Sequence, residues 1–296
     1  MSSRLRIGTR GSALALWQAR WVQTLLNATG AKSELVPIDA TGDKELQKPL
    51  YEMGVQGIFT KELDHALLAK KVDLAVHSMK DVPTQLPEGI AAVFIPKRGP
   101  HADVFLTANP NWEKEKSVIA TSSLRRAAQW RYAYPNHQIT DIRGNVPTRL
   151  KKLKEGNFDG TIMAQAGLVR LDMLPNNAIV LDWMVSAPAQ GAILVTGLES
   201  NRKLWEQLKK LNHTETESCV TEERSFLRTL EGGCTAPIGA YACIENNRMY
   251  FKGCVSQKDG SKQLLFEEDF PLDKKEIGQH AAMKLLKLGA KQLIDD

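Results

Sequence analysis

The sequence lacks the features of a membrane-spanning, exported or disordered chain. No apolar run approaches the roughly 18 residues that a spanning helix needs, so no membrane association is expected. No apolar stretch follows the charged residues at the start, so no signal peptide is expected. Aromatic residues are few, at 6%, yet 43% hydrophobic and 25% charged residues match an ordinary folded protein. A chain of 296 residues is long enough for two or three domains.

Cysteine is scarce and confined to the last third of the chain. The four cysteines form no C-x-x-C pair, which argues against a zinc ribbon or a redox dithiol. Because no secretory signal is evident, we expect reduced thiols and a cytoplasmic protein. The histidines have no acidic partner at ligand spacing, so no metal is expected.

Positive charge is concentrated in one segment. The net charge is +5, but residues 125–154 carry eight basic side chains and one acid, so this window is +7 and the remainder is −2. A basic window is compatible with binding of nucleic acid or of an acidic small molecule. The arginines follow expected strand ends and no nucleic-acid-binding module is recognisable, so we expect no nucleic-acid partner.

The first 200 residues alternate short β-rich runs with helical patterns. Strands are expected over 5–9, 34–38, 73–76, 118–120, 139–142 and 160–163. Helices are expected after Ser12, Thr60, Ser122 and Asn145. The first helix should bury Leu14, Trp17, Trp21 and Leu25, and the second Leu63, Leu67 and Leu68. This alternation predicts βαβ units with parallel sheets.

The composition changes after about residue 212. A helix over 216–230, strands over 238–244, 249–255 and 264–270, and a closing helix over 273–293 predict a small α+β domain. The segment Pro96–Pro100 is typical of a crossing between two units. The sequence therefore predicts three domains, two α/β and one α+β.

Polar and cationic residues follow several expected strands. Residues 9–12 (TRGS) and 77–83 (HSMKDVP) each stand where a strand ends, the place at which open α/β sheets bind ligands. Residues 121–126 (TSSLRR) and Arg143 to Arg149 repeat the pattern and direct four arginines towards one place. The residues allow a plainer interpretation too: Ser12 as an N-cap, and Lys80 with Asp81 as a solvated pair.

A cysteine between Gly232-Gly233 and Pro237 stands on a constrained loop. From the residues alone, Cys234 is either a reactive thiol or an inert one. The other cysteines fall in helix or strand patterns, where small core residues are expected.

Four segments together resemble the porphobilinogen deaminases, also called hydroxymethylbilane synthases. They are residues 77–83, 121–126, 143–150 (RGNVPTRL) and 231–234 (EGGC). Their order and spacing agree with the family from Arg10 to Pro237.

The resemblance implies an α/β fold of two doubly wound lobes like those of periplasmic binding proteins, plus a small α+β C-terminal domain with a three-stranded antiparallel sheet. It implies a first lobe formed by 1–97 and 193–213, a second by 98–192, and a third domain by 214–296. It further implies a transferase with a dipyrromethane cofactor joined by a thioether to Cys234. Four porphobilinogen molecules are then deaminated and joined head to tail, and water releases hydroxymethylbilane, a precursor of haem. A cytoplasmic monomer is expected.

The resemblance also assigns site residues. Asp81 matches the catalytic aspartate, which can hydrogen-bond pyrrole N–H groups, stabilise the cation left by loss of ammonia and shuttle protons. Cofactor-binding positions are Cys234, Lys80, Ser78, Thr121, Ser123, Arg125, Arg126, Arg143 and Gly144. Substrate-binding positions are Arg10, Ser12, Arg149, Gln18, Phe59 and Gln190. Each pyrrole ring brings two carboxylates, so the growing chain needs a lining of cations that do not titrate.

Two segments depart from the family pattern. Glu52 and Gln56 stand where many members have lysines in an active-site flap, and the spacing from Pro188 to Gln190 is shorter than usual. The alternative function is a non-catalytic solute-binding protein for an acidic ligand. That function accounts for the lobes and the arginines, but not for Cys234 on its Gly-Gly loop.

Overall fold

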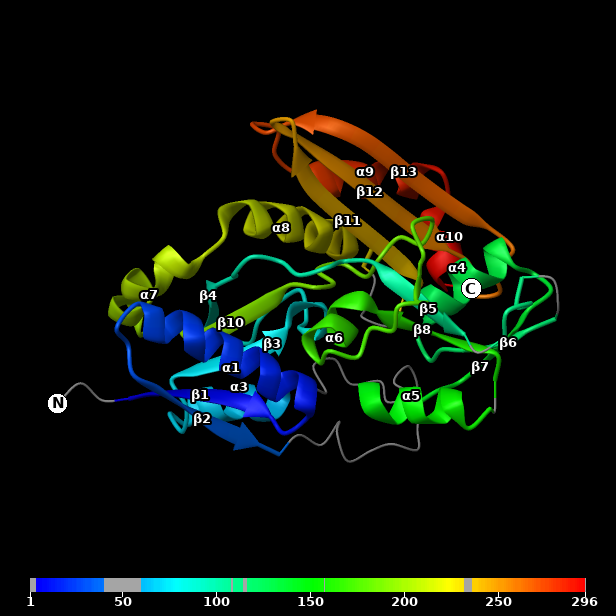
Figure 1. Cartoon of the computed structure of the whole chain (residues 1–296). Helices are drawn as coiled ribbons and strands as arrows, with labels where there is room; N and C mark the ends of the chain where they lie inside the picture. Colours follow the sequence, from blue (N-terminus) through cyan, green and yellow to red (C-terminus); the bar gives the residue numbers. More distant parts are fainter. Residues whose placement is uncertain are drawn as a thin grey trace.

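The computed structural model describes residues 4–39, 60–107, 109–113, 116–156, 158–231 and 236–295. These residues form two sheet-containing lobes that lie side by side, with a third unit packed against both (Figure 1). Within these ranges, none of the helices has the length and apolar character needed to cross a membrane.

The first lobe is built on a sheet with the strand order β2-β1-β3-β10-β4. Its strands are β1 (Leu5–Arg10), β2 (Ser33–Ile38), β3 (Leu74–Ser78), β4 (Ile90–Phe94) and β10 (Ile193–Leu198). Helix α1 (Ala13–Ala28) packs on the face that carries Leu74 and Val76, whereas α3 (Lys61–Leu68) packs on the face that carries Ala75. Successive strand residues therefore supply two separate cores, as a doubly wound sheet requires. Helix α7 (Arg202–Leu208) and a short turn, η3 (Lys209–Leu211), follow β10.

The second lobe repeats this plan. Its sheet has the order β7-β6-β8-β5-β9. The strands are β5 (Asp103–Thr107), β6 (Val118–Ala120), β7 (Gln138–Thr140), β8 (Gly160–Ala164) and β9 (Ile179–Val180). Helix α4 (Leu124–Ala133) buries Trp130 on the face that carries Phe105, while α5 (Val146–Lys154) and α6 (Gln165–Arg170) cover the face that carries Val104.

The third unit places helices on an antiparallel sheet of order β11-β12-β13. It comprises α8 (Thr214–Thr229), β11 (Ile238–Glu245), β12 (Arg248–Ser256), β13 (Gln263–Pro271), α9 (Ile277–Lys287) and α10 (Ala290–Asp295). The turn between β11 and β12 has Asn246 and Asn247 at φ values of 49° and 59°. Two such residues form the tight turn whose twist matches that of the flanking strands.

The fold class is as predicted, but four details differ. Both lobe sheets are mixed rather than parallel, because β10 runs antiparallel to β3 and β4, and β5 runs antiparallel to β8 and β9. The closing helix is two helices, since Gly289 between α9 and α10 adopts φ 92° and ends the first.

The buried faces of α1 and α3 also differ from those expected. Helix α1 buries Ala15, Gln18, Ala19, Val22 and Leu26, whereas the stripe of Leu14, Trp17, Trp21 and Leu25 is only half-buried. In α3, Leu63 and Leu67 are buried but Leu68 is 46% exposed. Trp21 still packs against the core of the first lobe, whereas Trp17 faces Arg170 of the second lobe at 5.6 Å.

Two segments, residues 95–102 and 181–192, cross between the lobes, and one buried carboxylate joins both to the third unit. Glu223 of α8 is wholly buried and accepts hydrogen bonds from the Arg98 guanidinium at 2.6 and 3.1 Å. It also accepts the backbone N–H groups of Ala189 and Ala242, at 2.6 and 2.8 Å. The first crossing, the second crossing and β11 therefore meet on a single side chain.

Candidate active site

The turn that carries Lys80 and Asp81 follows β3 directly. It is a single 3₁₀ turn, η2 (Met79–Asp81), whose first backbone N–H donates to the carbonyl of Ala192 at 3.0 Å. Arg224 of α8 donates to the carbonyls of Met79, Val82 and Pro83, at 3.3, 2.9 and 2.5 Å. The backbone of the turn is therefore held by the second crossing and by the third unit.

Other predicted residues of the first lobe lie near this turn. The Gln18 side-chain amide donates to the Ser78 hydroxyl at 2.9 Å, so α1 and the end of β3 are joined at this point. Burial and the charge of Arg10 lower the pKa of His77 to about 4, which places Arg10 near the same strand. The Ser12 hydroxyl accepts the Ala15 N–H at 3.3 Å and caps α1.

In the second lobe, the predicted hydroxyl residues shape the start of α4. Ser123 is the N-cap, and its hydroxyl accepts the Arg126 N–H at 3.5 Å. Thr121 accepts the Ser123 N–H at 3.3 Å. The two arginines that follow are therefore placed in the first turn of the helix, at the carboxyl end of β6.

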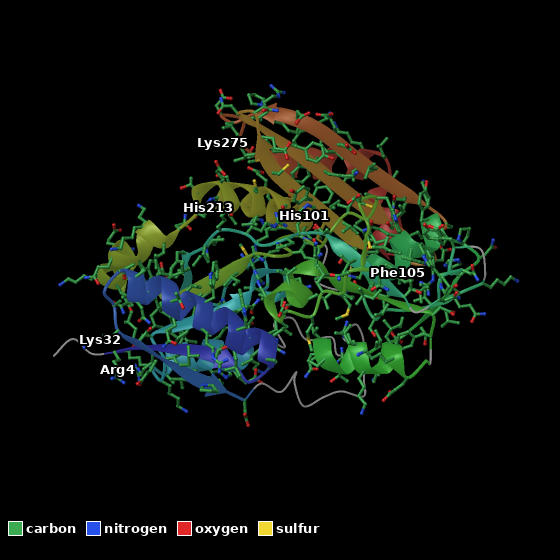
Figure 2. All side chains as sticks on the ribbon, viewed as in Figure 1. Arg4, Lys32, His101, Phe105, His213 and Lys275 are labelled. Atoms are coloured by element: carbon green, nitrogen blue, oxygen red, sulfur yellow. The ribbon has the colours of Figure 1, made fainter. Side chains whose placement is uncertain are left out.

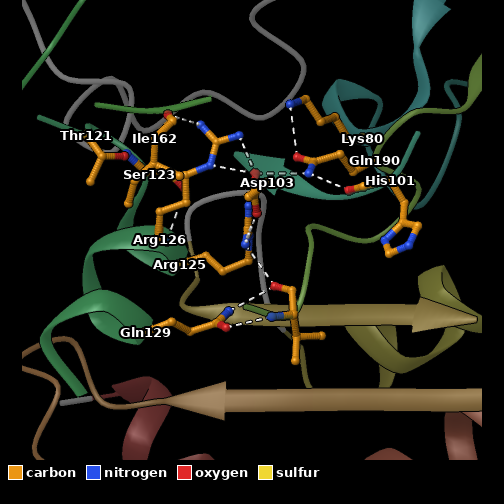
Figure 3. Close-up of polar contacts among 11 residues, drawn as sticks. Lys80, His101, Asp103, Thr121, Ser123, Arg125, Arg126, Gln129, Ile162 and Gln190 are labelled. Atoms are coloured by element: carbon orange, nitrogen blue, oxygen red, sulfur yellow. Dashed lines mark hydrogen bonds and ion pairs between the residues drawn. The ribbon is translucent and has the colours of Figure 1, made fainter. Parts of the chain in front are cut away.

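Arg125 and Arg126 share one buried carboxylate, that of Asp103 (Figure 3). Arg125 Nη1 lies 2.8 Å from Asp103 Oδ2, and Arg126 Nη2 lies 2.7 Å from Oδ1. Burial alone raises the pKa of Asp103, but the two arginines and a hydrogen bond from Gln190 hold it well below its usual range. Asp103 is therefore ionised whenever the protein is folded near neutral pH.

The next strand end places Arg143, Gly144 and Arg149. Gly144 adopts φ 118°, and an ideal Cβ there would lie 2.6 Å from Cγ2 of Thr148, so a residue with a side chain does not fit. Asn145 caps α5, and Arg149 donates from Nε to the Gly144 carbonyl at 2.8 Å. Glycine thus permits the turn that brings the Arg149 guanidinium back over the start of its own helix.

Electrostatic interactions connect these groups across the two lobes. Burial lowers the pKa of Lys80 to about 8; Asp81 and Asp103 oppose this shift, and Arg126 and Arg125 add to it. We call Lys80, Asp81, Arg125, Arg126, Arg143 and Arg149 the interlobe site.

Arg149 shows the same crowding. Burial, Arg126 and Arg143 lower its pKa to about 10, while Asp81 opposes the shift. Among the described residues, cations from both lobes thus lie within electrostatic reach of one another: Lys80 interacts with Arg125 and Arg126, and Arg149 with Arg126 and Arg143. Repulsion of this kind is relieved by a ligand that carries several carboxylates, so the residues fit the predicted dipyrromethane.

Gln190 is placed differently from the other predicted residues. It is 1% exposed, lies in the second crossing and donates to the His101 carbonyl at 2.7 Å and to Asp103 Oδ1 at 3.0 Å. Its carbonyl oxygen accepts from Lys80 Nζ at 3.4 Å. Gln190 therefore lies behind Lys80 and contacts both lobes. Figure 2 places His101 between the second lobe and the third unit, where its ring stacks on Tyr241 with centroids 3.5 Å apart.

Sequence reasoning missed Asp103, Glu223 and Arg224. The only available signal was an acid that immediately precedes or interrupts an apolar pattern: Asp103 opens the run Val104-Phe105-Leu106, and Glu223 stands at a buried position of α8. A buried acid needs a buried partner, and the partners are distant in the sequence.

Some predicted residues lie outside the described residues. These are Phe59, the flap positions Glu52 and Gln56, and Cys234. The three described cysteines are free: Cys219 and Cys254 are buried as expected, and Cys243 is half-buried. In the described part of the chain, no group of three or more His, Cys, Asp or Glu side chains is arranged to hold a metal ion.

Comparison with known proteins decides the family. A family model described as porphobilinogen deaminase, dipyromethane cofactor binding domain, matches residues 5–206, and one described as porphobilinogen deaminase, C-terminal domain, matches residues 217–287. The chain belongs to the porphobilinogen deaminase family. A porphobilinogen deaminase of Trichlorobacter lovleyi is 42% identical over 99% of this chain and 96% of that protein. One of Pelotomaculum thermopropionicum is 40% identical over 99% and 97%.

Solved structures with a similar backbone are more distant. The periplasmic VFT2 domain of BvgS from Bordetella pertussis is 12% identical with a TM-score of 0.43, over 75% of this chain and 90% of that one. A periplasmic substrate-binding protein of an ABC transporter from Coxiella burnetii is 13% identical with a TM-score of 0.45, over 74% and 94%.

Membership in the porphobilinogen deaminase family confirms the predicted family, enzyme class and cofactor. The chain is a transferase of tetrapyrrole biosynthesis, and its matched N-terminal region is the cofactor-binding region of the family.

Proposed function

We propose that the interlobe site is where this chain deaminates four porphobilinogen molecules and joins them into hydroxymethylbilane. The observation that supports this most strongly is that Asp81 lies within electrostatic reach of Lys80 from the first lobe and of Arg149 from the second, with Arg125 and Arg126 beside Lys80. Porphobilinogen carries an acetate and a propionate, so each added ring brings two negative charges to these cations. A site for a neutral or cationic ligand has no use for such an arrangement.

Within this proposal, Cys234 binds the dipyrromethane covalently. Lys80, Ser78, Thr121, Ser123, Arg125, Arg126, Arg143 and Gly144 hold it, and Arg10, Ser12, Arg149, Gln18 and Phe59 serve the incoming substrate. Gln190, which lies behind Lys80, serves the substrate through that lysine. When bound, the dipyrromethane supplies the pyrrole carbon to which the first substrate ring is joined. The hydroxyls of Ser12 and Ser123 already cap helices, so in this role each accepts an N–H of its own chain while donating to a carboxylate.

Asp81 acts on the reacting atoms. When the protonated amino group leaves the aminomethyl side chain of porphobilinogen as ammonia, the C–N bond breaks with its electron pair on nitrogen, and positive charge develops on the methylene carbon and the pyrrole ring. The Asp81 carboxylate accepts the ring N–H and stabilises this charge. After the new C–C bond forms, Asp81 takes up the proton that the attacking ring carbon loses. Arg149 lies within electrostatic reach of Asp81 and holds the carboxylates of the ring in register.

The proposal includes three domains, formed by residues 1–97 with 193–213, 98–192 and 214–296. It also includes a cytoplasmic monomer, as expected from the sequence; light scattering of the purified chain and cell fractionation test these two points.

Intact-mass measurement tests the function directly. The purified chain should carry the mass of one dipyrromethane, and Cys234→Ala should abolish it. Asp81→Asn should retain the mass but lower the turnover of porphobilinogen by about a hundredfold or more, the usual range for a lost acid–base group. An unmodified wild-type chain that does not consume porphobilinogen would refute the function, and full turnover by Asp81→Asn would remove Asp81 from the mechanism.

A further inference from the structure

Asp103 lies at the centre of a polar network that reaches both lobes (Figure 3). It is the first residue of β5 and is 0% exposed. Its Oδ1 accepts from Arg126 Nε at 2.9 Å and lies 2.7 Å from Arg126 Nη2, while its Oδ2 lies 2.8 Å from Arg125 Nη1. One carboxylate thus fixes the guanidiniums of two buried arginines, residues that are 5% and 6% exposed.

Backbone carbonyls fix the other side of each guanidinium. Arg125 Nη1 donates to the Val185 carbonyl at 2.8 Å, and Arg126 Nη1 donates to the Ile162 carbonyl at 3.0 Å. Each arginine is therefore held between a carboxylate and a carbonyl, which prevents rotation of the guanidinium. In the described residues these contacts occupy three of the five N–H groups of Arg126 and leave the others for a ligand.

A single amide extends the network to the first lobe. Gln190 Nε2 donates to Asp103 Oδ1 at 3.0 Å, and Gln190 Oε1 accepts from Lys80 Nζ at 3.4 Å. Because the amide donates on one side and accepts on the other, its orientation is determined by these two contacts. The position of the Lys80 ammonium group therefore depends on Asp103 through the side chain of Gln190.

We propose that Asp103 is a positioning residue for the polymerisation: it orients Arg125 and Arg126 towards the carboxylates of the bound pyrroles and, through Gln190, sets the position of Lys80 in the facing lobe. This inference rests on the proposed function. Without the Asp103 charge, two buried guanidiniums would repel each other with no fixed counter-ion, and both would turn towards solvent. Asp103 is not a catalytic residue, because it is enclosed by its partners and does not face the reacting atoms.

The test compares Asp103→Asn with two controls. Asp103→Asn keeps the shape of the side chain but removes its charge. Glu223→Gln removes a second wholly buried carboxylate, whose partner Arg98 donates from Nε to the Gln190 backbone carbonyl at 2.8 Å, so it measures the loss of a buried charge next to the network while the Asp103 side chain stays intact. Asp73→Asn removes the partner of Arg6, to which Asp73 lies at 2.9 Å in the first lobe. The measurements are intact mass of the purified chains, thermal melting, and kcat and KM for porphobilinogen.

We expect Asp103→Asn to lower the fraction of chains that carry dipyrromethane and to lower kcat/KM about a hundredfold, as misplacement by about 1 Å does. Asp103→Glu should restore part of both. Glu223→Gln should lose at least as much thermal stability while keeping its dipyrromethane mass, and Asp73→Asn should keep both mass and kcat/KM.

Gln190→Met keeps Asp103 and both arginines but breaks the connection to Lys80. It should raise KM about tenfold, the effect of one lost hydrogen bond to a charged group. It therefore gives a second test should Asp103→Asn fail to fold.

If the wild-type chain is active and either Asp103→Asn or Gln190→Met has the same kcat/KM and the same dipyrromethane mass as wild type, the positioning role alone is overturned. If Asp103→Asn lowers only the melting temperature and leaves the kinetics unchanged, the positioning role is overturned as well. A wild-type chain with neither the mass nor the activity overturns both this inference and the proposed function.

Discussion

Replacement of Glu223 by glutamine should destabilise the whole chain, because each of its carboxylate oxygens accepts two hydrogen bonds in a buried place. Oε1 accepts from Arg98 Nη1 and the Ala242 N–H, and Oε2 accepts from Arg98 Nη2 and the Ala189 N–H. In glutamine one oxygen becomes an NH₂ group, so one N–H of Arg98 and one backbone N–H would point at another hydrogen-bond donor. The substitution therefore leaves N–H groups of Arg98 and of the backbone without an acceptor.

The expected loss follows from the geometry. Removing one partner of a buried ion pair costs about 3–5 kcal/mol, and each buried donor left unsatisfied costs about 1–3 kcal/mol. We therefore expect a loss of about 4 kcal/mol, a large share of the roughly 5–15 kcal/mol by which folded domains are stable. At about 2–4 °C per kcal/mol for a large domain, the melting temperature should fall by about 8 °C or more.

Differential scanning calorimetry measures this loss, with Glu215→Gln as the control. Glu215 is exposed on the same helix, and its replacement should change stability by less than about 1 kcal/mol. The double variant Arg98→Met with Glu223→Gln should lose less than the sum of the single losses, since the two side chains share one interaction. A Glu223→Gln chain that melts within about 2 °C of wild type would contradict the reasoning.

Three further predictions follow from particular contacts. Burial lowers the pKa of Lys80 from 10.5 to about 8, so between pH 8 and pH 10.5 the unfolded chain holds a proton that the folded chain has released. The stability of wild type relative to Lys80→Met should therefore rise over this pH range. Urea unfolding of both chains at pH 7 and pH 10 measures the change, and an equal stability difference at the two pH values would contradict the prediction. Gly144→Ala should cost about 1–3 kcal/mol, because φ is 118° and the new Cβ meets Thr148; an unchanged urea midpoint would refute this. Arg170→Lys should cost about 1–2 kcal/mol, because it removes the planar cation from the Trp17 ring and the hydrogen bond from Arg170 Nη2 to the Gly191 carbonyl at 2.7 Å; equal stability of Arg170→Lys and wild type would argue against both contacts.

The local elements could be predicted because each has a local cause. Ser123 and Asn145 follow strands, and each caps the helix that begins after it. The turn at Asn246 and Asn247 requires two residues with positive φ, which asparagine adopts readily. The stripe of large apolar residues on α1 is only half-buried: Trp21 packs against the first-lobe core, but Trp17 faces the second lobe. Spacing identifies the stripe of Trp17 and Trp21 but does not say which neighbour covers it, and alanines at Ala15 and Ala19 allow closer packing on the sheet.

Long-range partners could not be read from spacing. Arg125 and Arg126 are recognisable as anion ligands, yet nothing near them in the sequence indicates that Asp103 lies between them. Likewise, Gln190 could be assigned to the substrate only by resemblance, whereas its contacts with Asp103 and Lys80 depend on two segments that cross between the lobes. Such groups come together only when the tertiary fold forms.

The place of β10 has a consequence for how this chain is made. β10 lies between β3 and β4, but it is synthesised only after the whole second lobe. At about 5–20 residues per second, β4 and β10 leave the ribosome roughly 5–20 s apart. During that interval, β3 and β4 lack the neighbour that later pairs with both of them, and unpaired strands of this kind join readily to other chains. The sheet that begins first during translation is therefore completed only after the sheet of the second lobe, and the newly made chain is most in need of protection by chaperones before residue 198 emerges.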